Sequence, residues 1–174
     1  MKRRYSVKKL CITALLMAMN IIMSSSALSI PVPGGHVYLN DFVICTAAIL
    51  LDPLSAFLVG GVGAFLGDML FYPTPMFVSL AVHGVQALTV SVFTHKLFKS
   101  RPKAGSVIGV ILGAVITVAG YHFGRAYIYA TPAYAIIKLP FQIGQEIIGS
   151  AAALLLCWSC GIVKVFRRYF PEEA

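Results

Sequence analysis

A glycine-rich apolar run, VGGVGAFLGDMLFYPTP, extends over Val59–Pro75 and ends with an aspartate, aromatic residues and two prolines. Gly60, Gly63 and Gly67 recur at helical spacing, so we expect a helix with a nearly bare face that another helix can approach closely. Asp68 follows directly after that face. An ionisable side chain at the centre of a membrane helix costs about 2.5–3.5 kcal/mol on insertion scales, so it usually has a partner or a ligand. Asp68 is therefore predicted to form one wall of a binding site, whereas the glycines alone indicate helix packing.

Other polar residues also interrupt apolar segments, and all of them map to the same half of the membrane. Buried polar groups without partners cost several kcal/mol each, so we expect these side chains to converge on one another or on a hydrogen-bonding ligand. Gln142, Gln145 and Glu146 are three and four positions apart and share one helix face. The predicted binding residues are Asn40, Asp41, Asp68, Tyr72, His83, Gln86, His122, Arg125, Gln142, Gln145 and Glu146.

Several of these residues also have a purely structural interpretation. A histidine such as His83 on an apolar helix is often packed against a backbone carbonyl. Asn40 could cap the helix that it begins, and Arg125 could pair with Asp41 or Asp68. The cluster is therefore a stronger signal than any of its members.

The composition places these residues in a membrane protein. Of 174 residues, 59% are hydrophobic and 11% are charged, against about 25% charged in an ordinary soluble domain. A bilayer core of about 30 Å requires roughly 20 helical residues per crossing. The chain is predicted to be an all-α integral membrane protein of the cell membrane, a single multi-pass domain over residues 1–174 with six transmembrane helices.

The six helices are expected in segments separated by proline, glycine and basic residues. Asp52-Pro53 gives one helix start, because an aspartate cap before a proline in the first turn is typical of it. Residues 28–38 are expected to form an outer loop. The first segment also resembles a secretory signal peptide, whose cleavage would leave five crossings. The expected helices are 8–27, 39–51, 54–71, 76–98, 104–127 and 139–166.

The net charge of +8 follows the membrane topology. Twelve of the 14 basic residues lie within 2–9, 96–103 and 164–168. These segments share one side if six helices cross, and the positive-inside rule makes that side cytoplasmic, together with both termini. The pattern argues against nucleic acid as a partner. Arg125 and Lys138 remain on the outer side, where topology gives them no reason to be.

Motifs for catalysis or for resident metals are not found in the sequence. There is no GxxxxGK[ST] phosphate loop, HExxH or GxSxG, and no carboxylate pair at metal-binding spacing. Cys157 and Cys160 form a CxxC near the inner end of the last helix, where packing is the favoured interpretation. We therefore expect no enzyme activity, cofactor or metal, and any active uptake would need partner subunits.

The succession NDF, GGVGAFLGD and YPTPMF, together with six helices and the spacing Ala14-xxx-Ala18, resembles the substrate-binding S component of an energy-coupling factor (ECF) vitamin transporter. The resemblance covers nearly the whole chain. It implies that Ala14 and Ala18 dock on a transmembrane coupling subunit. It further implies that the outer polar cluster binds a vitamin, and that the S component topples in the lipid bilayer to deliver it, driven by two ATPase subunits.

The glycine-rich run is most similar to the subset that takes pyridoxine or hydroxymethylpyrimidine, often labelled as riboflavin-type. A small, neutral heteroaromatic ring would suit tyrosines for stacking, His and Gln for ring nitrogens and hydroxyls, and Asp68 or Glu146 as an anchor. Riboflavin, pantothenate and folate remain alternatives. A structural membrane protein that binds no small molecule is the competing class, and an intramembrane enzyme acting on lipid or prenyl groups is a third.

Overall fold

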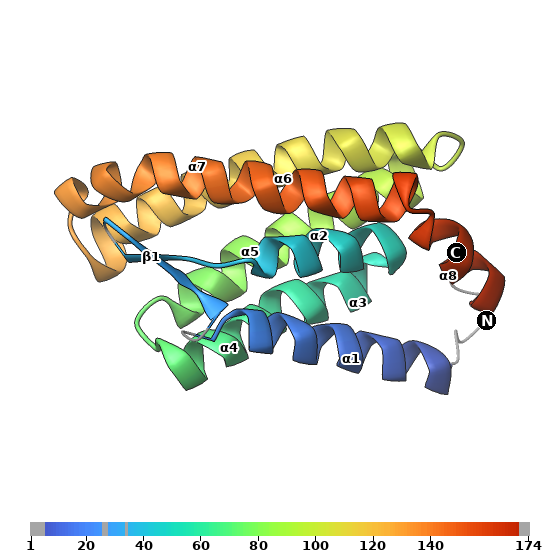
Figure 1. Cartoon of the computed structure of the whole chain (residues 1–174), viewed down its shortest axis with the longest axis horizontal. Coiled ribbons are helices and arrows are strands. Elements are labelled where there is room, and N and C mark those ends of the chain that lie inside the picture. Colours follow the sequence, from blue (N-terminus) through green and yellow to red (C-terminus); the bar gives the residue numbers. More distant parts are fainter. Residues whose placement is uncertain (1–5, 26–27, 34, 171–174) are drawn as a thin grey trace.

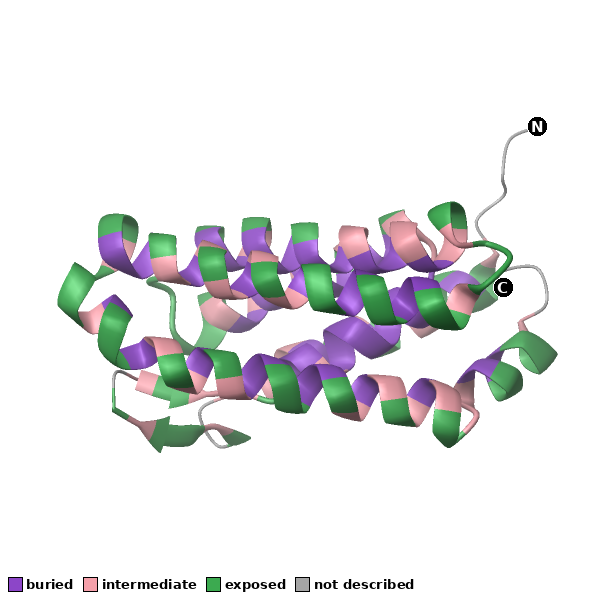
Figure 2. Ribbon diagram, turned by 90° about the horizontal axis from the view of Figure 1, so that it is seen from above, coloured by how far each residue is buried: buried purple, intermediate pink, exposed green. Residues whose placement is uncertain are grey.

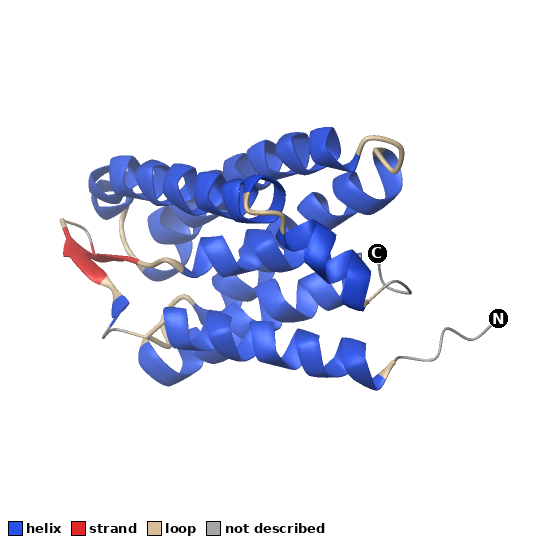
Figure 3. Ribbon diagram, turned by 45° about the vertical axis from the view of Figure 1, so that its right-hand side comes forward, coloured by secondary structure: helices blue, strands red, loops and turns tan. Residues whose placement is uncertain are grey.

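The computed structural model describes residues 6–25, 28–33 and 35–170 of the chain, which form a helical bundle with one small hairpin (Figures 1 and 3). The first helices are α1 (Val7–Met23), α2 (Asn40–Leu50), α3 (Pro53–Phe57), the π-helical η2 (Leu58–Val62) and α4 (Gly63–Phe71). They are followed by α5 (Met76–Val92), η3 (Phe93–Leu97), α6 (Pro102–Gly124), η4 (Arg125–Tyr129), α7 (Pro132–Leu154), η5 (Leu155–Ser159) and α8 (Ile162–Tyr169).

Four continuous helices in the described part of the chain are long and apolar enough to cross a membrane. They run over Pro53–Phe71, Met76–Leu97, Pro102–Tyr129 and Pro132–Ser159. The 17 residues of α1 and the 11 of α2 make shorter helices. At 1.5 Å per residue α2 is about 16 Å long, and all of its residues except Phe42 are buried. It therefore lies inside the bundle, whose buried positions face inward in Figure 2.

The glycine-rich run lets one helix pack closely against two others. A Cβ on Gly60 would lie 2.8 Å from the Cβ of Ala87 on α5, whereas one on Gly67 would lie 2.7 Å from the Cβ of Ser24, which follows α1. The sequence predicted a single bare face, but the structure divides it between two neighbours. Asn20 adds a buried polar contact that was not predicted, because its Nδ2 donates to the carbonyl of Val59 at 2.7 Å.

The expected last helix, 139–166, is wrong at both ends. The helix begins at Pro132, because Thr131 caps it with its Oγ1 accepting from the amide of Tyr134 at 3.3 Å and proline suits the first turn. Pro140 lies within the helix. At the other end, Gly161 adopts a φ of 78°, in the left-handed region that favours glycine, and separates α8 from the preceding segment.

The other boundaries differ by fewer residues. Helix α1 ends at Met23, where the prediction extended to 27, and the predicted 104–127 helix runs over Pro102–Tyr129. The predicted outer loop contains an antiparallel hairpin of β1 (Ile30–Val32) and β2 (Gly35–Val37), in which Ile30 pairs with Val37.

The two ends of the bundle differ in charge. The start of α1, the connection from η3 to α6, and α8 lie at one end in Figure 1, and the hairpin lies at the other. Exposed basic residues gather at the first of these ends, on the connection and on α8. They are Lys96, Lys99, Arg101, Lys103, Lys164, Arg167 and Arg168.

Candidate binding site

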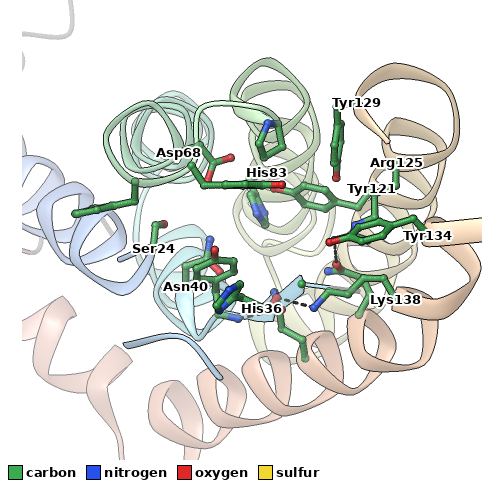
Figure 4. Close-up of a pocket in the computed structure, with 17 residues that line it drawn as sticks. Ser24, His36, Asn40, Asp68, His83, Tyr121, Arg125, Tyr129, Tyr134 and Lys138 are labelled. Atoms are coloured by element: carbon green, nitrogen blue, oxygen red, sulfur yellow. Dashed lines mark hydrogen bonds between the residues drawn. The ribbon is translucent and has the colours of Figure 1, made fainter. Parts of the chain in front are cut away.

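A cavity of about 350 Å³ lies at the hairpin end of the bundle (Figure 4). Its walls come from the hairpin, the start of α2, the end of α4, the connection to α5, α5 itself, the end of α6 with η4, and the first half of α7. The lining residues are Ser24, Gly35, His36, Tyr38, Asn40, Asp68, Phe71, Tyr72, Pro75, His83, Tyr121, Arg125, Tyr129, Tyr134, Lys138, Gln142 and Gln145. The volume is at the lower end of the roughly 300–1,000 Å³ typical of small-molecule sites.

Seven of the eleven predicted residues line this cavity, although they come from segments that are more than 100 residues apart in the chain. They are Asn40, Asp68, Tyr72, His83, Arg125, Gln142 and Gln145. Asp41, Gln86 and Glu146 are not on the wall, but they bond to residues that are. His122 is half-buried and does not line the cavity.

Gln86 and Glu146 form a buried hydrogen-bonded layer between α5 and α7. Nδ1 of His83 lies 2.8 Å from Oε1 of Gln86, and Nε2 of Gln86 donates to Oε2 of Glu146 at 3.2 Å. Nε2 of Gln142 donates to Oε1 of the same carboxyl group at 3.4 Å. Because Gln86 and Glu146 are at most 1% exposed, this layer positions the side chains of His83 and Gln142 in the wall.

Asp41 joins α2 to α7 through another buried hydrogen bond. Its Oδ2 accepts from Nε2 of Gln145 at 2.6 Å, and its Oδ1 lies 3.6 Å from Nδ1 of His83. Oε1 of Gln145 in turn accepts from the backbone amide of Tyr38 at 3.1 Å. The entry to α2 and the middle of α7 are therefore fixed relative to each other by a fully buried carboxyl group.

Asp68 is held at the cavity wall by a chain of hydroxyl groups. Oγ of Ser79 donates to its Oδ2, and the same Oγ lies 2.6 Å from the hydroxyl of Tyr121. The ring of Tyr121 meets the ring of His83 edge-on, with centroids 5.2 Å apart. Figure 4 shows the Asp68 carboxyl group on the side of the cavity opposite Lys138.

Two basic side chains lie on the wall formed by η4 and α7. Nη2 of Arg125 donates to Oε1 of Gln142 at 2.8 Å, and its guanidinium carbon is 5.2 Å from the centroid of the Tyr121 ring, a favourable cation–π distance. Nζ of Lys138 donates to the carbonyl of His36 at 2.5 Å. The ion pair between Arg125 and Asp41 or Asp68 that the sequence allowed does not form.

The sequence prediction missed most of the aromatic wall. Phe71, Tyr38, Tyr121, Tyr129 and Tyr134 come from different segments and share no periodic pattern. At Tyr38, just outside the helices, burial and the nearby Asp68 carboxylate raise the pKa of the hydroxyl. That hydroxyl is therefore protonated at neutral pH and can donate a hydrogen bond.

The small residues of α1 lie outside this site. Ala14 and Ala18 are exposed and, being four residues apart, occupy the same face of the helix. The buried residues of α1, which include Leu16 and Asn20, point the other way into the bundle.

Comparison with known proteins identifies the family to which this chain belongs. A family model described as the S component of an ECF-type riboflavin transporter matches residues 4–160. The chain therefore belongs to this family of membrane transporter S components, which is not an enzyme family.

Individual relatives are more distant. An uncharacterised protein of Pyrococcus woesei is 30% identical over 74% of this chain and 86% of its own length. The thiamine precursor transporter HmpT of Lactococcus lactis is 28% identical over 94% of this chain and 95% of its own length. A solved S component of a bacterial ECF transporter superposes with a TM-score of 0.65 at 16% identity, over 86% of this chain and 93% of that one, and so shares the fold.

Proposed function

We propose that this chain is the substrate-binding subunit of an ECF-type vitamin uptake transporter, and that it captures a small heteroaromatic vitamin or vitamin precursor from outside the cell. The observation that carries the proposal is the cavity at the hairpin end. It combines stacking surfaces from five tyrosines with carboxyl, amide and imidazole groups already held in place. The 28% identity with a thiamine precursor transporter over nearly the whole chain supports a substrate of hydroxymethylpyrimidine or pyridoxine size.

The orientation in the membrane is part of the same proposal. Both termini would be cytoplasmic, with six crossings in which the short α2 counts as one. The exposed basic residues at the end opposite the cavity support this assignment through the positive-inside rule. The cavity then opens toward the outside, where the substrate is captured.

Delivery of the substrate inward requires partners in this proposal. A transmembrane coupling subunit would dock on the face of α1 that carries Ala14 and Ala18, and two ATPase subunits would supply the energy. The exposure of both alanines supports this role, because small residues allow the backbones of membrane helices to approach closely.

Riboflavin is the second candidate substrate, on the ground that the matching family carries its name. Its three fused rings and ribityl chain require more space than a single ring. The cavity volume of about 350 Å³ therefore favours the smaller precursors.

The test is native mass spectrometry of the detergent-purified protein, followed by thermal unfolding with pyridoxine, hydroxymethylpyrimidine, riboflavin, pantothenate or folate. A ligand that binds only the folded state at 100 times its Kd stabilises it by about 2.7 kcal/mol. A co-purified single-ring compound, or stabilisation by one, supports the proposal. Stabilisation by riboflavin alone would favour the second candidate, and failure of every compound to bind would count against the proposed function.

A further inference from the structure

The two basic residues that the membrane topology leaves unexplained both line the cavity. Twelve of the 14 lysines and arginines lie in the three segments assigned to the inner end. Arg125 is on η4 and Lys138 is on α7, and both reach the same wall at the hairpin end. A role in orientation across the membrane cannot account for them, since the positive-inside rule disfavours cations on this side.

Both cations are buried and have only neutral partners. Arg125 is 9% exposed and Lys138 is 2% exposed. The acceptor of Arg125 is the amide oxygen of Gln142, and that of Lys138 is the backbone carbonyl of His36. Among the described residues neither forms an ion pair with a carboxylate. A buried charge without a counter-ion is costly, so such charges are normally paired.

The carboxyl groups near the cavity are already engaged elsewhere. Asp68 accepts from Ser79 on the opposite side, and Asp41 accepts from Gln145. Glu146 accepts from Gln86 and Gln142 and reaches Arg125 only through the Gln142 side chain. Acidic side chains therefore lie close to the cavity, yet neither Arg125 nor Lys138 pairs with one of them. Both cations can pair with an anionic ligand.

We propose that the substrate carries an anionic group, a carboxylate or a phosphate monoester, that binds between Arg125 and Lys138. The inference rests on the proposed function and replaces the neutral ring expected from the sequence with an aromatic ring that bears a negative charge. Arg125 supplies the planar fork that matches the oxygens of such groups, and Lys138 supplies a point charge.

The surroundings of the two cations fix the orientation of the rest of the ligand. Tyr134 lies between Arg125 and Lys138 in Figure 4, and Tyr121 and Tyr129 lie next to Arg125. An aromatic ring attached to the anionic group would thus lie against tyrosine faces. Its far edge would then reach Asp68, which can accept a hydrogen bond from a hydroxyl or ring N–H of the ligand.

The experiment compares matched compounds that differ in the anionic group. Pyridoxine is compared with pyridoxine 5′-phosphate, hydroxymethylpyrimidine with its monophosphate, and nicotinamide with nicotinate, by thermal unfolding and isothermal titration of the purified protein. We expect the anionic member of at least one pair to bind about tenfold tighter or more, since a charge-assisted hydrogen bond is about twice as strong as a neutral one. Whether this preference is found in a phosphate pair or in the carboxylate pair then identifies the anionic group.

Variants assign that preference to the two residues. Lys138→Met and Arg125→Gln should each weaken the anionic member about tenfold or more and by clearly more than the neutral member, whereas Lys138→Arg should retain the preference. Arg101→Gln and Lys103→Met remove the same charges at the opposite end and serve as controls. If the cations exist for the ligand, Lys138→Met should also unfold at an unchanged or higher temperature without ligand.

The outcomes separate this inference from the proposed function. If the neutral member of every pair binds as tightly as the anionic member, or if the preference survives both substitutions, the inference of an anionic group is wrong. The proposed function as a vitamin-binding subunit would still stand. Failure of both members of all three pairs to bind would overturn the proposed function and this inference with it. A Lys138→Met protein that unfolds at a clearly lower temperature without ligand would make Lys138 an anchor of the hairpin instead.

Discussion

Gly149 on α7 lies directly against Asp41 on α2. A Cβ on Gly149 would be 2.8 Å from the Cβ of Asp41 and 3.1 Å from the amide nitrogen of Phe42. One turn earlier on α7, Gln145 donates to the Asp41 carboxyl group. The close approach of α2 and α7 and the hydrogen bond between Gln145 and Asp41 therefore depend on the same contact.

Substituting Gly149 by alanine should destabilise the protein. The added methyl group meets backbone and Cβ atoms, and overpacking of this kind typically costs about 1–3 kcal/mol. Thermal unfolding in detergent measures the effect. Gly144→Ala is the matched control on the same helix, because nothing lies within 4 Å of its Cβ position and alanine is favoured over glycine in helices by roughly 0.5–1 kcal/mol. Equal unfolding temperatures for the two variants would contradict the close contact.

Replacing the carboxyl group of Asp68 or Glu146 by an amide should weaken ligand binding at least about tenfold, the size expected from losing a strong hydrogen bond. Asp68→Asn keeps an acceptor for Ser79, so the protein should still fold. Glu146→Gln leaves one acceptor oxygen for the two amide donors, Gln86 and Gln142. The side chain of Gln142, which accepts a hydrogen bond from Arg125, should therefore shift. Isothermal titration with the ligand found in the screen measures both.

Asp52→Asn is the control for these two variants, since it removes a carboxylate at the opposite end of the bundle. Expression levels should be similar for all three proteins. Unchanged affinity in both Asp68→Asn and Glu146→Gln would remove these residues from the site.

The sequence predicts in which half of the membrane a residue lies better than it predicts which residues that residue contacts. The predicted topology placed Asp68, His83 and Gln142 in the same half of the membrane, and all three line the cavity. The same topology placed Gln86 and Glu146 in that half as well, but it could not show that other side chains separate them from the cavity. Which residue covers which depends on helix rotation and packing, which the polar pattern does not specify.

Local competition explains the missed boundaries. The hairpin has strands of three residues each, too short for an alternating pattern to be recognised. At α7 two starts compete, because Pro132 and Pro140 both suit a first turn. Thr131 decides between them, since its side chain accepts the amide hydrogen of Tyr134. Most of the aromatic wall was missed because its tyrosines converge only after the segments that carry them have packed.

The ion pair between α1 and the turn before α3 predicts a specific pH dependence. Nζ of Lys9 lies 2.7 Å from Oδ1 of Asp52. Burial of Asp52 opposes ionisation, but hydrogen bonds from Lys9 and Ser55 and the charge of Lys9 outweigh it and lower the pKa of this carboxyl group. A lowered pKa in the folded state means that the stabilisation is complete above the unfolded pKa, about 3.9, and is lost as the pH falls through the folded value.

Asp52→Asn should therefore unfold at a lower temperature than the original protein at pH 7, by an amount corresponding to about 1 kcal/mol or less for a partly exposed pair. The difference should shrink as the pH is lowered below 4, as thermal unfolding across a pH series would show. Lys9→Met should reproduce the effect. A difference that stays constant down to pH 3 would mean that the Asp52 charge contributes nothing.

Replacing Ala14 and Ala18 together by leucine should abolish uptake and leave ligand binding intact. Both side chains are exposed on one face of α1, so the leucines would not disturb the bundle but would keep a coupling helix from approaching closely. Uptake in cells that express the coupling and ATPase subunits, and titration of the purified variant, measure the two effects. Ala81→Leu makes the same type of substitution once, at an exposed position of α5, and should transport normally. Loss of binding in the α1 variant would show instead that these alanines serve internal packing, and normal uptake would place the docking surface elsewhere.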